Sequence, residues 1–177
     1  MARLWVGIDV GKDGAIVALT DDGLLHAKTK TPVVTGVKSR REYDEPGMVR
    51  VLQSFEREGM KPHVTIEKAQ PLPPTMGGTQ TNFARGLGFG LWKGILTALQ
   101  IPHTVVASRT WQPAMFADQR VADTRQASIV AASRLWPHVD WRRSEKAQKQ
   151  DDGLTDAALL AEYGRRLMTR GATLEIA

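Results

Sequence analysis

Acidic side chains at three separate places in the sequence could do chemistry together. Asp9 follows the apolar run RLWVGI, and Glu67 closes a second apolar run, HVTI. Asp152 and Asp156 open the last amphipathic segment of the chain. Their spacing of four residues places them on nearly the same side of a helix, where like charges are destabilising unless something neutralises them.

Each of these carboxylates also has a simpler explanation. An acid that closes an apolar strand is often just the first solvated residue after the core. Asp151 or Asp152 could cap the last helix, because the helix dipole favours acids in the first turn. Capping explains Asp156 poorly, since that residue sits deeper in the helix beside the apolar side chains. We therefore predict that the last helix brings its aspartates to the sheet ends that carry Asp9 and Glu67.

A cluster of four partly buried carboxylates needs a counter-charge, because their mutual repulsion would otherwise be prohibitive. Mg²⁺ prefers oxygen ligands and keeps several waters, so acids without histidine or cysteine suit it. Two such ions about 3.5–4 Å apart can activate a water and stabilise the leaving oxygen in phosphodiester cleavage. We expect two Mg²⁺ ions per site, with Mn²⁺ as a substitute.

The composition of the 177-residue chain fits these ligands and suggests a class of partner. The chain has no cysteine, which excludes disulfides and thiolate metal sites and fits a reducing cytoplasm. Its four histidines are scattered and lack the spacing of a zinc motif. A formal net charge of +5 favours a polyanionic partner. The longest apolar stretch, 86–101, is too short to span a membrane, and no signal peptide is recognisable.

The elements that must position the acids predict an α/β layer fold. Three predicted strands joined by short turns favour an antiparallel meander. The later predicted strands are separated by helices, which favours parallel crossover connections. We expect 32–44 to be a basic loop, 68–80 a loop rich in proline and glycine, and 137–150 a basic connector. Residues 1–177 are expected to form one domain. The predicted strands are 3–9, 15–20, 24–31, 63–67 and 103–108, and the predicted helices are 46–58, 81–100, 109–117, 122–136 and a final one within 148–166.

Several of these segments, taken in order, are similar to a known family. The stretches GIDVGKDGAIVAL, TIEKAQPLP, NFARGLGFGLWKGILTAL, ASRTWQ and KQDDGLTDAALLAEYGRR together resemble RuvC-type Holliday junction resolvases. The likeness is to the phage and prophage branch of the ribonuclease H-like superfamily, and it spans roughly 3–168. It implies a mixed five-stranded sheet flanked by helices. It also implies a Mg²⁺-dependent, homodimeric endonuclease that makes paired symmetric nicks in four-way DNA junctions inside a bacterial host cell.

The resemblance assigns roles to individual acids. Asp9, Glu67 and Asp156 match the metal-binding acids of the family. The fourth ligand is less direct, because the spacing in the bacterial enzymes would place it on Gly153. We select Asp152 for that position, with Asp151 as the substitute.

DNA contacts are expected from the loop after Glu67, from the first turn and from the connector. The resemblance implies that an aromatic side chain near the loop reaches the junction centre; Phe83 is the candidate, although it could instead pack the start of its helix. Trp111 matches a family position but is expected in the core. Further basic residues at 38, 40 and 41 could also face a duplex. The predicted DNA-binding residues are Lys12, Phe83, Arg85, Arg142, Arg143, Lys146 and Lys149.

Three other functions compete with junction resolution. The same acids would serve a ribonuclease H-like nuclease that cuts other branched DNA or structured RNA. A non-catalytic DNA-binding module would use the acids as helix caps only. An actin-like or sugar-kinase ATPase also carries a DxG after its first strand, but that fold needs two such halves and about twice this length.

Overall fold

A mixed sheet of five strands forms the centre of the computed structural model, which describes residues 2–57, 59–73, 75, 78–116 and 123–169. The strands lie in the order β3-β2-β1-β6-β7. The first three form the predicted antiparallel meander, and β6 and β7 run parallel to β1. The expectation of a mixed five-stranded sheet is thus confirmed. The bounds are β1 (Arg3–Ile8), β2 (Ala15–Leu19), β3 (Leu25–Lys30), β6 (Lys61–Glu67) and β7 (His103–Val106).

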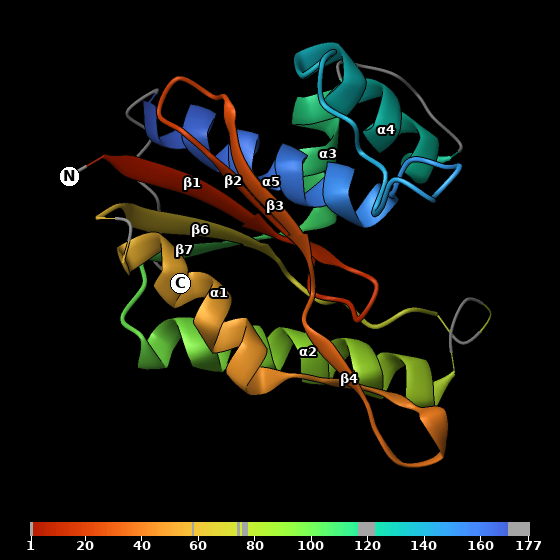
Figure 1. The fold of residues 1–177 in the computed structure, drawn as a ribbon. Coiled ribbons are helices and arrows are strands. Elements are labelled where there is room, and N and C mark those ends of the chain that lie inside the picture. The colour runs from red at the N-terminus through yellow and green to blue at the C-terminus, as the bar shows by residue number, and fades with distance from the viewer. Residues whose placement is uncertain (1, 58, 74, 76–77, 117–122, 170–177) are drawn as a thin grey trace.

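Helices cover both faces of this sheet, so its central strands are apolar on both sides (Figure 1). Every residue of β2 is buried, as is every residue of β1 after Arg3. Helices α1 (Glu45–Arg57) and α2 (Thr79–Ala98) pack one core, and α3 (Ser108–Phe116), α4 (Thr124–Leu135) and α5 (Asp152–Thr169) pack the other.

Helix α5 lies so close to β1 and β6 that glycines are required at the contacts. A Cβ at Gly7 would lie 1.9 Å from the carbonyl oxygen of Ala157, a backbone atom that cannot move aside. A Cβ at Gly164 would lie 2.0 Å from the hydroxyl of Thr65. These contacts determine where along β1 the helix sits and therefore where its first turns end up.

The predicted basic loop 32–44 is wrong, because most of it forms a small hairpin. Strands β4 (Val33–Thr35) and β5 (Arg41–Tyr43) pair antiparallel, and a 3₁₀ turn (Val37–Ser39) joins them. The hairpin ends in the core, where Tyr43 is buried. Three-residue strands carry too little pattern to be recognised without their partners.

Other boundaries differ from the predicted ones by a few residues. Helix α2 begins at Thr79 rather than 81, and β7 ends at Val106 because α3 starts at Ser108. Some predicted positions lie outside the described residues. These are the end of the predicted helix 109–117, the start of the predicted helix 122–136, and residues 74, 76 and 77 of the predicted loop. Within the described part of the chain, no helix is long and apolar enough to cross a membrane.

Candidate active site

The first pair of acids lies at the carboxyl ends of two neighbouring parallel strands. Ile8 pairs with Ile66 in the β1–β6 ladder, so Asp9 follows β1 beside Glu67, the last residue of β6. The backbone N–H of Asp9 donates to the carbonyl of Ala15 at 3.0 Å, which holds Asp9 at the start of the β1–β2 turn. Open α/β sheets bind ligands at this edge.

The second pair comes from the first turns of α5. The helix begins at Asp152, and Asp156 precedes Ala157, the residue whose carbonyl faces Gly7 on β1. The close contact between helix and strand therefore brings Asp156 to the end of the strand that precedes Asp9. All four acids are partly buried rather than solvated.

Electrostatic coupling connects these four side chains. Burial, together with the nearby charges of Glu67 and Asp152, raises the pKa of Asp9 to about 6 against the opposing effect of Lys30. Burial also raises the pKa of Asp156 well above its usual range, and the carboxylates of Asp9, Glu67 and Asp152 add to that rise. The structure thus brings the predicted acids into one negatively charged site, where a cation would relieve the repulsion.

The donor set fits a hard cation such as Mg²⁺, because it consists of carboxylate oxygens. A ready cage is not formed: among the described residues, no three acidic, histidine or cysteine side chains come close enough to hold an ion. Asp152 instead faces α4, with 3.2 Å between its Oδ2 and the Nε of Arg125. The elements bring the acids together, but the side chains stand apart in this structure.

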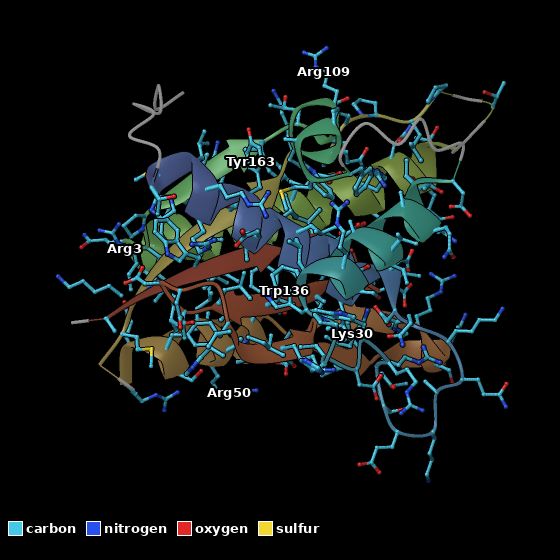
Figure 2. All side chains as sticks on the ribbon, turned by 90° about the horizontal axis from the view of Figure 1, so that it is seen from above. Arg3, Lys30, Arg50, Arg109, Trp136 and Tyr163 are labelled. Atoms are coloured by element: carbon cyan, nitrogen blue, oxygen red, sulfur yellow. The ribbon has the colours of Figure 1, made fainter. Side chains whose placement is uncertain are left out.

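Asp151 is engaged differently from its neighbour Asp152. Its carboxylate accepts from the backbone N–H of Leu154 at 3.1 Å, which is the contact of a helix N-cap. The ammonium of Lys30 lies 2.6 Å from the same carboxylate oxygen and also donates to the carbonyl of Asp13. Figure 2 marks the position of Lys30. Asp151 thus ties the start of α5 to β3 and to the turn after Asp9.

Lys30 was not among the predicted site residues, although the strand pairing of the predicted meander could have indicated it. It pairs with Ala15 across the β2–β3 ladder, so the register of the predicted meander places it beside the β1–β2 turn. Its partner Asp151, just before α5, is 121 residues away, and no pattern in the sequence indicated that contact.

Glu67 is held by two donors from α3 that the sequence did not reveal. The hydroxyl of Ser108 donates to Oε1 at 2.7 Å, and the indole N–H of Trp111 donates to Oε2 at 2.8 Å. The prediction that Trp111 lies in the core is confirmed, since its side chain is fully buried. Its hydrogen bond gives it a second role beside Glu67.

Two of the three predicted DNA-contacting residues of the first half, Lys12 and Phe83, line one hollow. Phe83 is 70% exposed, so it does not pack the start of α2. Lys12 lies across the hollow, where it donates to the carbonyl of Arg41 at 2.5 Å, and Arg85 is exposed on α2. The hollow has a volume of about 470 Å³ and is lined by Lys12, Arg40, Arg41, Glu42, Gln80, Phe83, Ala84 and Leu87.

The predicted residues of the connector fall into two groups. Arg143, Lys146 and Lys149 are exposed, and with Asp151 and Asp152 they line a second hollow of about 470 Å³. Arg142 differs from them, because its guanidinium donates hydrogen bonds to the carboxylate of Asp140 at 2.8–3.0 Å. It also donates to two carbonyls of the connector. The basic surface therefore begins directly beside an acid of the site.

An antiparallel meander followed by two parallel strands, with helices on both faces of the sheet, is a ribonuclease H-like fold. RuvC of Thermus thermophilus shares this fold. Its structure in complex with Holliday junction substrate matches at TM-score 0.61 and 16% identity, covering 97% of this chain and 96% of that one. Another Thermus thermophilus RuvC structure matches at TM-score 0.58 and 17% identity, covering 97% of both chains. The sequence matches no protein-family model and no curated protein.

Proposed function

We propose that this protein is a metal-dependent endonuclease that resolves four-way DNA junctions by paired symmetric nicks. The observation that carries the proposal is the coupling of four acids at the ends of β1, β6 and the start of α5, within a RuvC fold. A helix-capping role would not explain why Asp156 is buried close enough to Asp9 for the charge of Asp9 to raise its pKa. The similar structure of Thermus thermophilus RuvC in complex with Holliday junction substrate supports branched DNA as the partner.

The residues that would hold the cations are Asp9, Glu67, Asp152 and Asp156. Two Mg²⁺ ions, or Mn²⁺ in their place, supply an activated water and stabilise the leaving oxygen of the cleaved phosphodiester when bound. The neighbouring positions of Asp9 and Glu67 at the ends of β1 and β6 support this assignment. Asp151 anchors the helix that carries the other two.

The surroundings of the acids suit a branched nucleic acid. The exposed cations Arg143, Lys146 and Lys149 border Asp152 and would bind phosphates of the cleaved strand. On the other side, the exposed Phe83 would stack on bases at the junction centre, with Lys12 and Arg85 near the backbone. Arg142 would act indirectly, by shaping the connector through Asp140. A bacterial cytoplasm, where such junctions form, is the expected place of action.

A homodimer would match the two-fold symmetry of the junction. The exposed side of α2 is the surface we assign to it, because Gly86, Gly90 and Gly94 recur there every four residues and a Cβ at each would meet nothing within 4 Å. Glycine costs a helix about 1 kcal/mol per residue relative to alanine, a cost that close backbone approach by a second copy would explain. Sedimentation should show a dimer that Gly90→Arg weakens; a monomer at every concentration contradicts this assignment.

Cleavage of a synthetic four-way junction, beside a linear duplex of the same sequence, tests the function. We expect nicks placed symmetrically across the junction, dependent on Mg²⁺ or Mn²⁺. Asp9→Asn should abolish cutting and preserve binding, whereas Asp22→Asn, at an exposed turn, should change neither. Equal cutting of linear DNA, or cleavage that survives Asp9→Asn, would refute junction resolution. Cutting of forks, flaps or structured RNA in preference to the junction would favour the related nuclease function.

A further inference from the structure

Helix α3 contacts the candidate site through one acid, Glu67. Ser108 and Trp111 are three residues apart and therefore on the same side of the helix. Each occupies a different oxygen of the Glu67 carboxylate, at 2.7 Å and 2.8 Å. Two bonds to two oxygens fix both the rotation and the tilt of the carboxylate plane, which a single bond would leave free.

The Trp111 donor is held rigidly. Its side chain is fully buried, and its ring lies edge-on to Phe116 with centroids 5.7 Å apart. Because the indole cannot turn away without opening the core, its N–H points at a defined place. The backbone of Glu67 is held as the last residue of β6. The strand and helix α3 together therefore determine the direction of the free lone pairs of its carboxylate.

We propose that Ser108 and Trp111 are positioning residues that orient Glu67 and thereby set the cation affinity of the site. The inference rests on the proposed function only in taking Glu67 as a metal ligand. Each carboxylate oxygen has two lone-pair directions. One on each oxygen accepts from α3, which leaves the others available to a cation. Hydrogen bonds from such supporting residues orient ligands, and their loss commonly weakens metal binding 10- to 100-fold.

Another buried tryptophan provides a matched control. Trp141 is also almost completely buried, but its indole nitrogen has no hydrogen-bond partner among the described residues. Trp111→Phe and Trp141→Phe therefore remove similar buried volume, and only the first removes a donor to Glu67. Ser108→Ala removes the other donor, and Ser108→Thr restores a hydroxyl.

Mn²⁺ binding by the full chain, measured without DNA by calorimetric titration, tests the proposal. Trp111→Phe and Ser108→Ala should each weaken Mn²⁺ affinity about tenfold. Trp141→Phe and Ser108→Thr should remain within about twofold of the parent chain. Urea unfolding of each variant shows whether it is folded. If Trp111→Phe is not folded, the comparison of Ser108→Ala with Ser108→Thr tests the proposal.

The possible outcomes separate this inference from the function. Equal Mn²⁺ affinity in folded Trp111→Phe and Trp141→Phe, with Ser108→Ala equal to Ser108→Thr, overturns the positioning role even if the parent chain cuts junctions. Weakened binding in the two donor variants alone supports it even if the parent cuts no junction. A parent chain that binds no Mn²⁺ overturns both.

Discussion

Asp151 and Asp152 are chemically identical neighbours with different surroundings. The carboxylate of Asp151 is mostly buried, capped onto Leu154 and paired with Lys30. Asp152 is almost half exposed, contacts an exposed arginine and adds to the repulsion at Asp9 and Asp156. A carboxylate that already neutralises an ammonium has less to offer a cation. The surroundings favour Asp152 as the fourth ligand and give Asp151 a structural role.

Alanine substitution should separate the two roles. Asp151→Ala should lower the free energy of unfolding by about 1–2 kcal/mol, because it removes an N-cap and leaves a partly buried lysine unpaired. Asp152→Ala should change stability by less than about 0.5 kcal/mol but abolish metal-dependent cleavage. Urea unfolding and junction cleavage measure these effects. Loss of cleavage in a folded Asp151→Ala variant, with Asp152→Ala active, would reverse the assignment.

Phe83 should matter for the junction and not for the fold. Because the side chain is 70% exposed, Phe83→Ala should leave unfolding within about 0.5 kcal/mol of the parent chain. Junction cleavage should fall at least about tenfold if the ring stacks on bases, since such stacking is worth about 1–3 kcal/mol. Leu24→Ala, at another exposed apolar residue, is the control. Undiminished cleavage by Phe83→Ala would remove the aromatic contact from the proposal.

At the scale of elements, the position of α5 depends on its backbone contact with β1. The carbonyl of Ala157 occupies the space that a side chain at Gly7 would need. Neither a strand in the middle of a sheet nor a buried helix can shift locally, because both are packed on all sides. The geometry of the site is therefore coupled to this one glycine, although Gly7 carries no functional group.

Gly7→Ala should be strongly destabilising. Overpacking against a backbone atom should lower the free energy of unfolding by about 3 kcal/mol and, in any folded fraction, move Asp156 away from Asp9 and weaken Mn²⁺ binding. Gly11→Ala is the control, since its Cβ would make only ordinary contacts from 3.6 Å. Chemical unfolding and metal titration give the comparison. Similar stability of the two variants would mean that α5 does not approach β1 this closely.

At the scale of the whole molecule, a negative site is set into a positively charged protein. The formal net charge is +5, exposed cations of the connector border Asp152, and the half-buried Lys12 lies in the turn after Asp9. The acids inside remain costly to ionise, as the raised pKa values of Asp9 and Asp156 show. Folding of the chain and cation binding should therefore be coupled through protonation.

The metal-free protein should lose stability as pH rises. The pKa of Asp9 is about 6 in the folded chain against an ordinary 3.8. Between pH 3.8 and pH 6 the folded state therefore keeps a proton on Asp9 that the unfolded state has lost. Above pH 6 the carboxylate is charged in both states, and the folded state is destabilised by on the order of 2–3 kcal/mol relative to pH 4. Mg²⁺ should restore stability near pH 7 by binding the charged acids.

Urea unfolding from pH 4 to 7, in EDTA and in Mg²⁺, measures this linkage. Other groups titrate over the same range, so the informative quantity is the difference between the parent chain and Asp9→Asn. That difference should grow with pH in EDTA and shrink in Mg²⁺. A parent chain and variant with parallel pH profiles would show that Asp9 is not held in a charged, buried cluster.

Sequence patterns alone predicted the main elements and the candidate acids Asp9, Glu67, Asp156 and Asp152, with Asp151 as the substitute for the last. Apolar runs ended by glycine or a carboxylate mark β1 and β6, because a buried strand must exclude charge until it leaves the core. Acids that follow parallel strands necessarily meet at one edge of the sheet. Asp9 and Glu67 could therefore be grouped before their positions were known. The basic loop 32–44 was predicted wrongly, since three-residue strands are stable only through their pairing with each other.

The contacts that hold each acid depend on packing between distant parts of the chain. Ser108 and Trp111 meet Glu67 across 41 and 44 residues of sequence, and Lys30 meets Asp151 across 121. Periodicity reports which side of an element is buried, but it does not report which side chain lies opposite. That choice depends on how closely the elements pack, as at Gly7 and Ala157, where the distance between two backbones determines which groups can meet.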